Sequence, residues 1–204
     1  TMSVTGIGSG TGDGCQGIIL SNAASIATTG GSQVLVGTGG GNGSSNQGLL
    51  VQSRGTISTS GSGSIALTAT GGKGTTNNHG LEIDGTGGSF ISTVDGHLSI
   101  TGKGGGDGNQ GIFMHSGGIT QATGSGGVNL FGTGSSQGTS NNHGIYIDGT
   151  GGTLISSING ALILIGHGGG TGTTNHGIFL SKGAVVQVTG TGMVHVHGTG
   201  SSKA

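Results

Sequence analysis

The sequence predicts an all-β fold, a parallel β-helix (β-solenoid) in which short strands wind into stacked coils. Three observations predict it. A polar residue, a glycine and an apolar–any–apolar triplet recur six times along the chain. The composition is extreme, with 55 glycines among 204 residues, no proline and 5% charged residues. Apolar and small polar residues alternate in short runs, as in strands with one buried face.

The composition also excludes other classes of protein. Leu, Ile, Val and Phe make up about a fifth of the chain, near the boundary for disorder. Disordered chains need charge or proline to stay solvated, and both are scarce here. Collagen needs glycine at every third position together with much proline, and glycine costs about 1 kcal/mol at each interior helix position. A β architecture of short strands and tight turns remains.

The repeat is defined by the anchors QGIIL, QGLLV, HGLEI, QGIFM, HGIYI and HGIFL. Their glycines are spaced by 31, 32, 31, 33 and 33 residues and stand at Gly17, Gly48, Gly80, Gly111, Gly144 and Gly177. We therefore predict a single domain, residues 1–204, of about six coils of 31–33 residues. The coils start near these glycines, and residues 1–16 are the end of a preceding coil.

Each coil is predicted to hold three short strands. In the second coil these are LLVQS (49–53), TIST (56–59) and SIALTAT (64–70), before the polar loop GGKGTTNN (71–78). The third strand recurs as MSVTG, QVLVG, HLSITG, VNLFG, LILIG and VHVHG. Six coils at the strand spacing of about 4.8 Å would stack to roughly 29 Å. The helix is taken as right-handed, with glycine supplying corner conformations with φ > 0.

A column of asparagines precedes the anchor glycines. Its members are Asn46, Asn78, Asn109, Asn142 and Asn175, and Cys15 takes the place in the first coil. Asparagine tolerates the left-handed conformation, and stacked amides can hydrogen-bond from coil to coil. We therefore expect an asparagine ladder at a corner of the coil.

The anchor pattern N-[QH]-G followed by apolar–any–apolar, with trailing TGxGG loops, resembles the glycine-rich repeats of very large bacterial surface and secreted proteins, the filamentous-haemagglutinin-like β-helix adhesins. This resemblance implies a parallel β-helix, an extracellular or cell-surface location and an adhesive or scaffolding role. It transfers no functional residue, because such repeats share no catalytic motif. The secretion signal is expected to lie outside this chain.

The function expected on these grounds is a structural or adhesive repeat segment that stacks into a longer rod or filament and has no enzymatic activity or cofactor. The alternative is a carbohydrate-binding or carbohydrate-cleaving β-helix domain. Both ends of the chain fall in a third strand without a polar cap, so we expect self-association end to end or laterally. Glycans or another cell surface are further expected partners.

Two classes of partner are not expected. The formal net charge of −1 gives no electrostatic reason to bind nucleic acid or an anionic membrane. No apolar run approaches the roughly 20 residues that span a bilayer.

The most informative candidate surface is the column formed by the middle residue of each anchor triplet. If the first and third residues point inward, this column points outward. It contains Ile19, Leu50, Glu82, Phe113, Tyr146 and Phe179, including three of the five aromatic residues of the chain. We interpret it as a contact stripe for a partner or for sugar stacking. The alternative is that a loop or a neighbouring chain covers it.

Catalysis and metal binding are both disfavoured by the pattern. Asp84 and Asp148 hold equivalent places two coils apart, about 10 Å by the strand spacing, which an inverting glycosidase pair would tolerate. Asp-Gly after a strand, however, is ordinary turn chemistry. His143 and His176, on adjacent coils, are the candidate metal ligands, but glutamine replaces histidine at this column in other coils. No metal site is therefore predicted.

Three weaker patterns point to other kinds of site. His195 and His197 of the VHVH run would be a second, weaker metal site. The loops around Asp13 and Asp107 resemble calcium-binding repeats but hold too few carboxylates. Threonine-rich strands suggest an ice-binding face, but the outward threonines of the third strand stop at Thr101.

Overall fold

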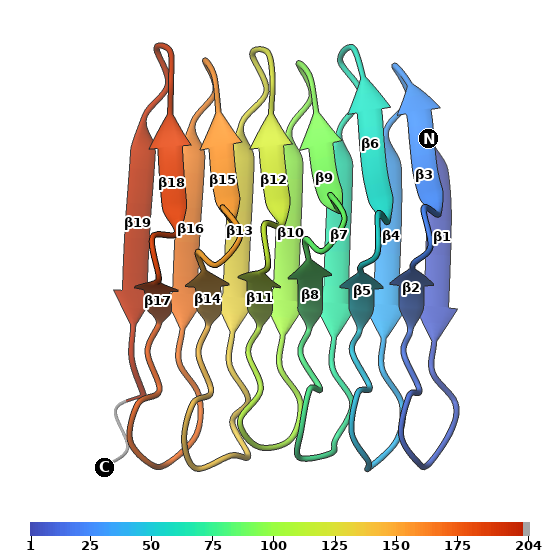
Figure 1. The fold of residues 1–204 in the computed structure, drawn as a ribbon, viewed down its shortest axis with the longest axis vertical. Coiled ribbons are helices and arrows are strands. Elements are labelled where there is room, and N and C mark those ends of the chain that lie inside the picture. The colour runs from blue at the N-terminus through green and yellow to red at the C-terminus, as the bar shows by residue number, and fades with distance from the viewer. Residues whose placement is uncertain (202–204) are drawn as a thin grey trace.

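The computed structural model describes residues 1–201 and consists of three parallel sheets without a helix in that range (Figure 1). Sheet A contains β1 (Met2–Ile7), β4 (Gln33–Thr38), β7 (Ile65–Thr70), β10 (Leu98–Lys103), β13 (Val128–Thr133), β16 (Leu162–His167) and β19 (Val194–Thr199). Sheet B contains β2 (Ile18–Leu20), β5 (Leu49–Val51), β8 (Leu81–Asp84), β11 (Ile112–His115), β14 (Ile145–Asp148) and β17 (Ile178–Ser181). Sheet C contains β3 (Ser25–Thr29), β6 (Thr56–Ser60), β9 (Phe90–Thr93), β12 (Ile119–Ala122), β15 (Leu154–Ser157) and β18 (Val185–Val188).

The chain visits sheets B, C and A in turn, so each coil contributes one strand to each sheet. Equivalent positions pair in parallel from coil to coil, as Ile18 with Leu49 and Leu49 with Leu81. The predicted β-solenoid of about six turns with three strands per coil is confirmed. Strand β1, within residues 1–16, starts sheet A before the first anchor.

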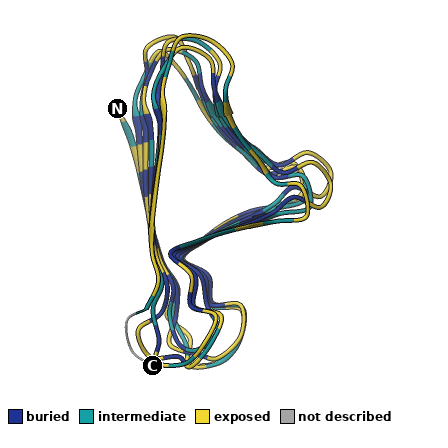
Figure 2. Cartoon of the chain, turned by 90° about the vertical axis from the view of Figure 1, so that its left-hand side faces the viewer, coloured by how far each residue is buried: buried dark blue, intermediate teal, exposed yellow. Residues whose placement is uncertain are grey.

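The core is a set of aliphatic columns inside the coil. Leu49, Ile57 and Leu67, one from each strand of the second coil, are at most 2% exposed. The alternating burial along the strands matches the predicted period of two. Viewed along the solenoid axis, sheets A, B and C form three sides of the coil, and the glycine-rich loops project beyond the place where sheet B approaches sheet A (Figure 2). A few aliphatic side chains per turn therefore fill the interior.

The anchor glycines mark a place where two backbones touch. A Cβ on Gly48 would overlap the backbone nitrogen of Thr70, and one on Gly37 would overlap the carbonyl oxygen of Gly48. The same contact recurs at the other anchors, as between Gly102 and Gly111. Glycine stands here because sheets A and B approach without room for a side chain. None of the anchor glycines is among the residues with positive φ.

The corner conformations differ in part from the prediction. Positive φ falls on glycines, but it also falls on non-glycine residues at the turns between sheets B and C, namely Asn22, Ala23, Ser53, Arg54, Ser116 and Lys182. The asparagine ladder itself does not adopt positive φ. The residue before each ladder position does, as Ser45, Asn77, Asn141 and Thr174 show. The prediction that the ladder asparagines adopt the left-handed conformation is therefore wrong: the residue before each of them adopts it. The asparagines contribute to the corner through their side chains rather than through their backbone conformation.

Candidate contact surface on sheet B

The outer face of sheet B carries three parallel columns of side chains. The middle residues of the anchor triplets do point away from the core, since Ile112 and Met114 on either side of Phe113 are fully buried inside. The central column is the predicted stripe. On one side lies the Gln/His column of Gln47, His79, Gln110, His143 and His176, and on the other lies a column of Asp84, His115, Asp148 and Ser181.

The three aromatic rings of the central column stack on one another. The ring centroids of Phe113 and Tyr146 are 5.0 Å apart at 20°, and those of Tyr146 and Phe179 are 5.0 Å apart at 24°. Imidazole rings flank the stack, with His79 edge-on to Phe113 at 5.1 Å. The faces of the middle ring are therefore covered by its neighbours, and the stack presents ring edges rather than a flat sugar platform.

The rest of the stripe is uneven in exposure. Ile19 is 50% exposed, whereas Leu50 is only 6% exposed and belongs with the buried residues. Phe113, Tyr146 and Phe179 are half-buried. The structure brings the predicted stripe together on one face, but only Ile19 and the ring edges are available to a partner.

Glu82 interrupts the apolar column with a half-buried charge. Its carboxylate contacts Nε2 of His115 at 3.1 Å and accepts a hydrogen bond from Nε2 of Gln47 at 2.6 Å. Burial alone would raise the pKa of Glu82. The hydrogen bond with His115, the electrostatic effect of His79 and the hydrogen bond from Gln47 outweigh burial, so the pKa is lowered. The repeat places Glu82 and His115 on adjacent coils but two positions out of register, so only the side-chain rotamers bring the two groups into contact.

His115 completes the pair from the next coil. Burial would lower its pKa, but the hydrogen bond and charge of Glu82 together with the charge of Asp84 raise it above the ordinary value. Its ring stacks on Phe113 at 4.5 Å, and its Nδ1 lies 2.8 Å from Oγ of Ser116. A cationic imidazole over an aromatic ring adds a cation–π contact. The pair thus anchors the N-terminal end of the aromatic stack.

His79 and His143 of the Gln/His column are held as neutral acceptors. The backbone N–H of Gln110 donates to Nδ1 of His79 at 3.2 Å, and that of His176 donates to Nδ1 of His143 at 3.2 Å. Both rings are 4% exposed. Burial lowers the pKa of His79 to about 4, and burial together with the charge of His176 lowers that of His143 to about 4. Protonation would also replace each acceptor by a second donor.

The candidate metal ligands do not converge. The rings of His143 and His176 are parallel within 3° with centroids 5.2 Å apart, and Nδ1 of His143 is already occupied. Parallel rings at this spacing aim their nitrogens side by side rather than at one point. His195 and His197 are exposed on β19. Across residues 1–201, no group of three or more His, Cys, Asp or Glu side chains could hold a metal ion.

The candidate catalytic carboxylates are engaged in their own turns. Asp84 accepts hydrogen bonds from the backbone N–H and hydroxyl of Thr86, at 3.0 and 2.6 Å, and Asp148 does the same with Thr150. Lys182 bonds Asp148 at 2.8 Å, and together with Thr150 it holds the pKa of Asp148 well below its ordinary value. A permanently ionised, bonded Asp148 is a poor proton donor.

The loop carboxylates join successive coils. Oδ1 of Asp13 accepts the backbone N–H of Ser44 at 2.6 Å, and Oδ1 of Asp107 accepts that of Thr139 at 2.7 Å. Each aspartate thus fixes the corresponding loop of the next coil. These hydrogen bonds explain the presence of Asp13 and Asp107 in the loops without a role in calcium binding.

The asparagine column is a continuous hydrogen-bonded ladder. The backbone N–H of Asn78 donates to Oδ1 of Asn109 at 2.8 Å, and that of Asn109 donates to Oδ1 of Asn142 at 3.2 Å. Asn46, Asn142 and Asn175 continue it, and the N–H of Cys15 donates to Asn46 at 2.6 Å at its start. The bonds run from backbone to side chain, with one amide-to-amide bond between Asn142 and Asn175. The ladder seals the corner between the glycine loops and sheet B.

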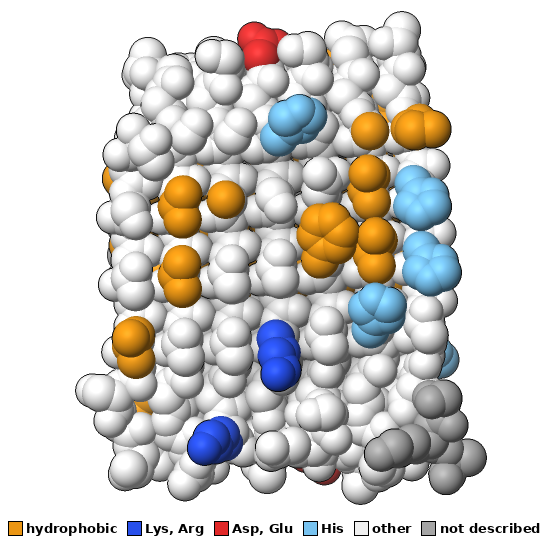
Figure 3. Space-filling view, turned by 180° about the vertical axis from the view of Figure 1, so that it is seen from behind, with side chains coloured by type: hydrophobic (Ala, Val, Ile, Leu, Met, Phe, Trp, Pro, Cys, Tyr) orange, Lys and Arg blue, Asp and Glu red, His pale blue; other side chains and the backbone are white. Residues whose placement is uncertain are grey.

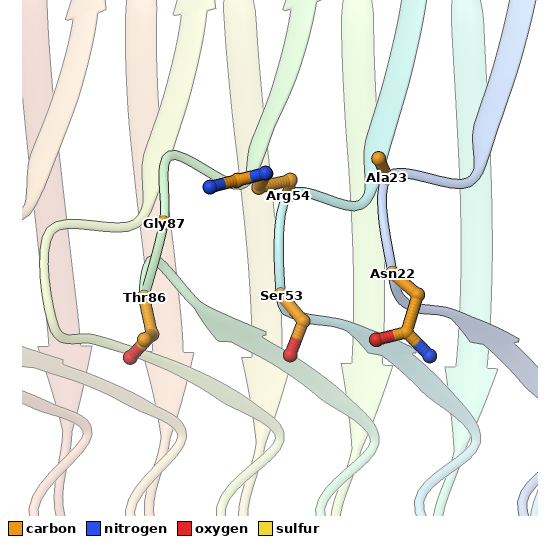
Figure 4. A pocket seen from close by; sticks show the side chains of 6 residues that line it. All are labelled: Asn22, Ala23, Ser53, Arg54, Thr86 and Gly87. Atoms are coloured by element: carbon orange, nitrogen blue, oxygen red, sulfur yellow. The ribbon is translucent and has the colours of Figure 1, made fainter.

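The turns between sheets B and C enclose a surface pocket of about 430 Å³ (Figure 4). It is lined by Asn22, Ala23, Ser53, Arg54, Thr86 and Gly87. Arg54 is the one charged residue among them and is exposed. The pocket lies at the far end of sheet B from the asparagine ladder and shares no residue with the stripe.

Comparison with known proteins adds no identification. No family model matches the chain, and neither curated proteins nor solved structures gave a match. Within the described residues no helix is long and apolar enough to cross a membrane.

Proposed function

We propose that this chain is a structural and adhesive repeat segment of a bacterial extracellular surface protein or filament, built to stack into a longer rod. The observation that carries the proposal is the unbroken coil-to-coil pairing of all three sheets, with the same ladders repeated at each step. Such a scaffold extends by adding coils without any new interface.

The open edge of the last coil shows which side chains a neighbouring coil covers. Val194 and Val196 of β19 occupy core columns, yet they are 46% and 49% exposed, whereas their partners Leu162 and Leu164 in β16 are fully buried. A further coil on this end would cover them and pair the free edges of the sheets. That coil could come from the same polypeptide or from another copy.

A concatemer tests the rod. A second copy of residues 8–199 is joined directly after Thr199. The repeat then continues without a shift, because Ile7 and Thr199 occupy equivalent positions in their strands of sheet A. Electron microscopy should show particles longer by about 29 Å at unchanged width, the rise of six coils. Two separate globules, or no gain in length, would refute the rod. Light scattering of the single copy measures self-association.

The adhesive part of the proposed function depends on the stripe on sheet B. Replacing Phe113, Tyr146 and Phe179 by Ser should abolish assembly or binding while circular dichroism still reports a folded β protein. Val34→Ser and Phe131→Ser, which change exposed apolar residues on sheet A, separate the stripe from general surface hydrophobicity. Unchanged assembly and binding in the triple variant would remove the stripe from the proposal.

The alternative is a carbohydrate domain. Cleavage is disfavoured by the bonding of Asp84 and Asp148 within their own turns. A glycan-array screen of the purified chain distinguishes a passive rod from a carbohydrate-binding one.

A further inference from the structure

Three hollows lie in a row where the strands of sheet A end and the glycine-rich loops begin. Their volumes are about 340, 210 and 270 Å³. The first and second share Thr70 to Lys73, and the second and third share Ser136. Together they form a trough along the solenoid axis, from Gly10 to Ser201. It is distinct from the stripe, which lies on sheet B.

The trough is positively charged. Lys73 and Lys103 line the middle hollow, whereas no carboxylate of residues 1–201 is among the side chains that line the three hollows. Both lysines are exposed, and neither forms an ion pair within residues 1–201. The outer face of sheet A shows lysine and histidine side chains, with acidic ones only at its margins (Figure 3). Glu82, Asp84 and Asp148 belong to sheet B, whereas Asp13 and Asp107 lie in the glycine-rich loops and each accept a backbone N–H of the next coil.

The rest of the lining is backbone and small polar groups. Gly72 and Gly105 pack against the preceding coil, where a Cβ would overlap the carbonyl oxygens of Gly40 and Gly72. Thr70, Ser136 and Gln137 add hydroxyl and amide groups. No Phe or Tyr of residues 1–201 lines the trough, so bases would have only the His167 imidazole on which to stack. Two lysines are also few for a polyphosphate backbone.

We propose that this trough binds a linear anionic polysaccharide, a polyuronate, lying along the rod axis. Lys103 pairs with Thr70 across one coil step, and Lys73 follows Thr70 by three residues, so the two lysines stand on successive coils but out of register. Both line the middle hollow, so carboxylates along a polyuronate can meet Lys103 at the strand end and Lys73 in the loop of the preceding coil. The hydroxyls of Thr70 and Ser136 and the amide of Gln137 then bond the sugar hydroxyls. The inference deepens the adhesive part of the proposed function and rests on it.

Titration calorimetry with alginate hexasaccharide tests the site. The double variant Lys73→Gln/Lys103→Gln should weaken binding at least tenfold. Lys182→Gln removes one positive charge from a turn between sheets B and C and should leave affinity unchanged. Ser136→Trp fills the junction of two hollows without changing charge, and it should weaken the hexasaccharide while sparing a disaccharide.

The proposal is overturned if the unmodified chain does not bind alginate at low salt, if Lys182→Gln weakens binding as much as the double variant, or if neutral maltohexaose or oligo(dT) binds as tightly. Assembly of the concatemer is measured on the same variants. If rods form but alginate does not bind, only the proposal for the trough is refuted. If rods do not form, the proposed structural role is refuted.

Discussion

At the scale of single residues, glycine and histidine have structural roles that composition alone does not reveal. Many of the glycines stand where two backbone segments approach too closely to leave room for a side chain. A Cβ on Gly106 would overlap the carbonyl oxygen of Gly74, and Gly106 also has φ of +58°. A Cβ on Gly12, in another glycine-rich loop, would meet no atom within 4 Å, and the φ of Gly12 is not positive. Residues of one type in similar loops therefore have different structural roles.

These two glycines give a matched pair of substitutions. Gly106→Ala should destabilise the fold by roughly 2–4 kcal/mol, because it adds both a clash and backbone strain. Gly12→Ala should change stability by no more than about 0.5 kcal/mol. Urea denaturation followed by circular dichroism measures both. Equal effects would show that glycine is needed for general flexibility rather than for the contact.

The buried histidines make stability depend on pH. The folded-state pKa of His79 is about 4, below the ordinary value of 6.5, so the unfolded chain takes up the proton first as the pH falls. The stabilising contribution is therefore complete above about pH 6.5 and is lost progressively down to about pH 4. One such group costs about 3 kcal/mol over this window.

His79→Gln/His143→Gln should flatten this acid-dependent loss, since glutamine already occupies the column at Gln47 and Gln110. Thermal melts between pH 4 and 7 measure the slope. His195→Gln, an exposed histidine on β19, serves as the control and should keep the slope of the unmodified chain. A double variant with an unchanged slope would contradict the neutral-acceptor role.

At the scale of elements, the asparagine ladder joins each coil to the next at the base of sheet B. Asn109 accepts from the backbone of Asn78 at 2.8 Å, and its Nδ2 donates to the carbonyl oxygens of Gly105 and Asp107. Asn109 is fully buried, so its removal leaves unsatisfied groups inside the protein. The ladder therefore holds the glycine loops, which have few side chains of their own.

Asn109→Ala should cost about 2–3 kcal/mol and increase hydrogen exchange at the amide of Asn78. Asn129→Ala, on the outer face of β13, should have little effect on either quantity. Hydrogen exchange read by mass spectrometry resolves the two regions. If the amide of Asn78 stays protected in Asn109→Ala, the ladder bond does not hold that corner.

At the scale of the whole molecule, each coil contacts only its neighbours, so stability should grow coil by coil. Deleting residues 177–204 removes β17, β18 and β19 but leaves the preceding strands paired. We expect the shortened chain to keep its β-sheet circular dichroism per residue and to melt a few degrees lower. Calorimetry gives the melting temperature, and complete unfolding of the shortened chain would indicate that the last coil is indispensable.

The sequence alone determined the β-solenoid, the three strands per coil and the columns of Asn109 and Tyr146, because a repeat with period-two alternation leaves one arrangement that buries its apolar residues. Only the tertiary structure decided what the columns do. The half-buried Glu82–His115 pair joins residues two positions out of register on adjacent coils, and ring orientation made the aromatic stripe a stack. The trough of Lys73 and Lys103 arises where strand ends of successive coils align. Such contacts depend on distances across coils and on side-chain rotamers, which a linear pattern does not specify.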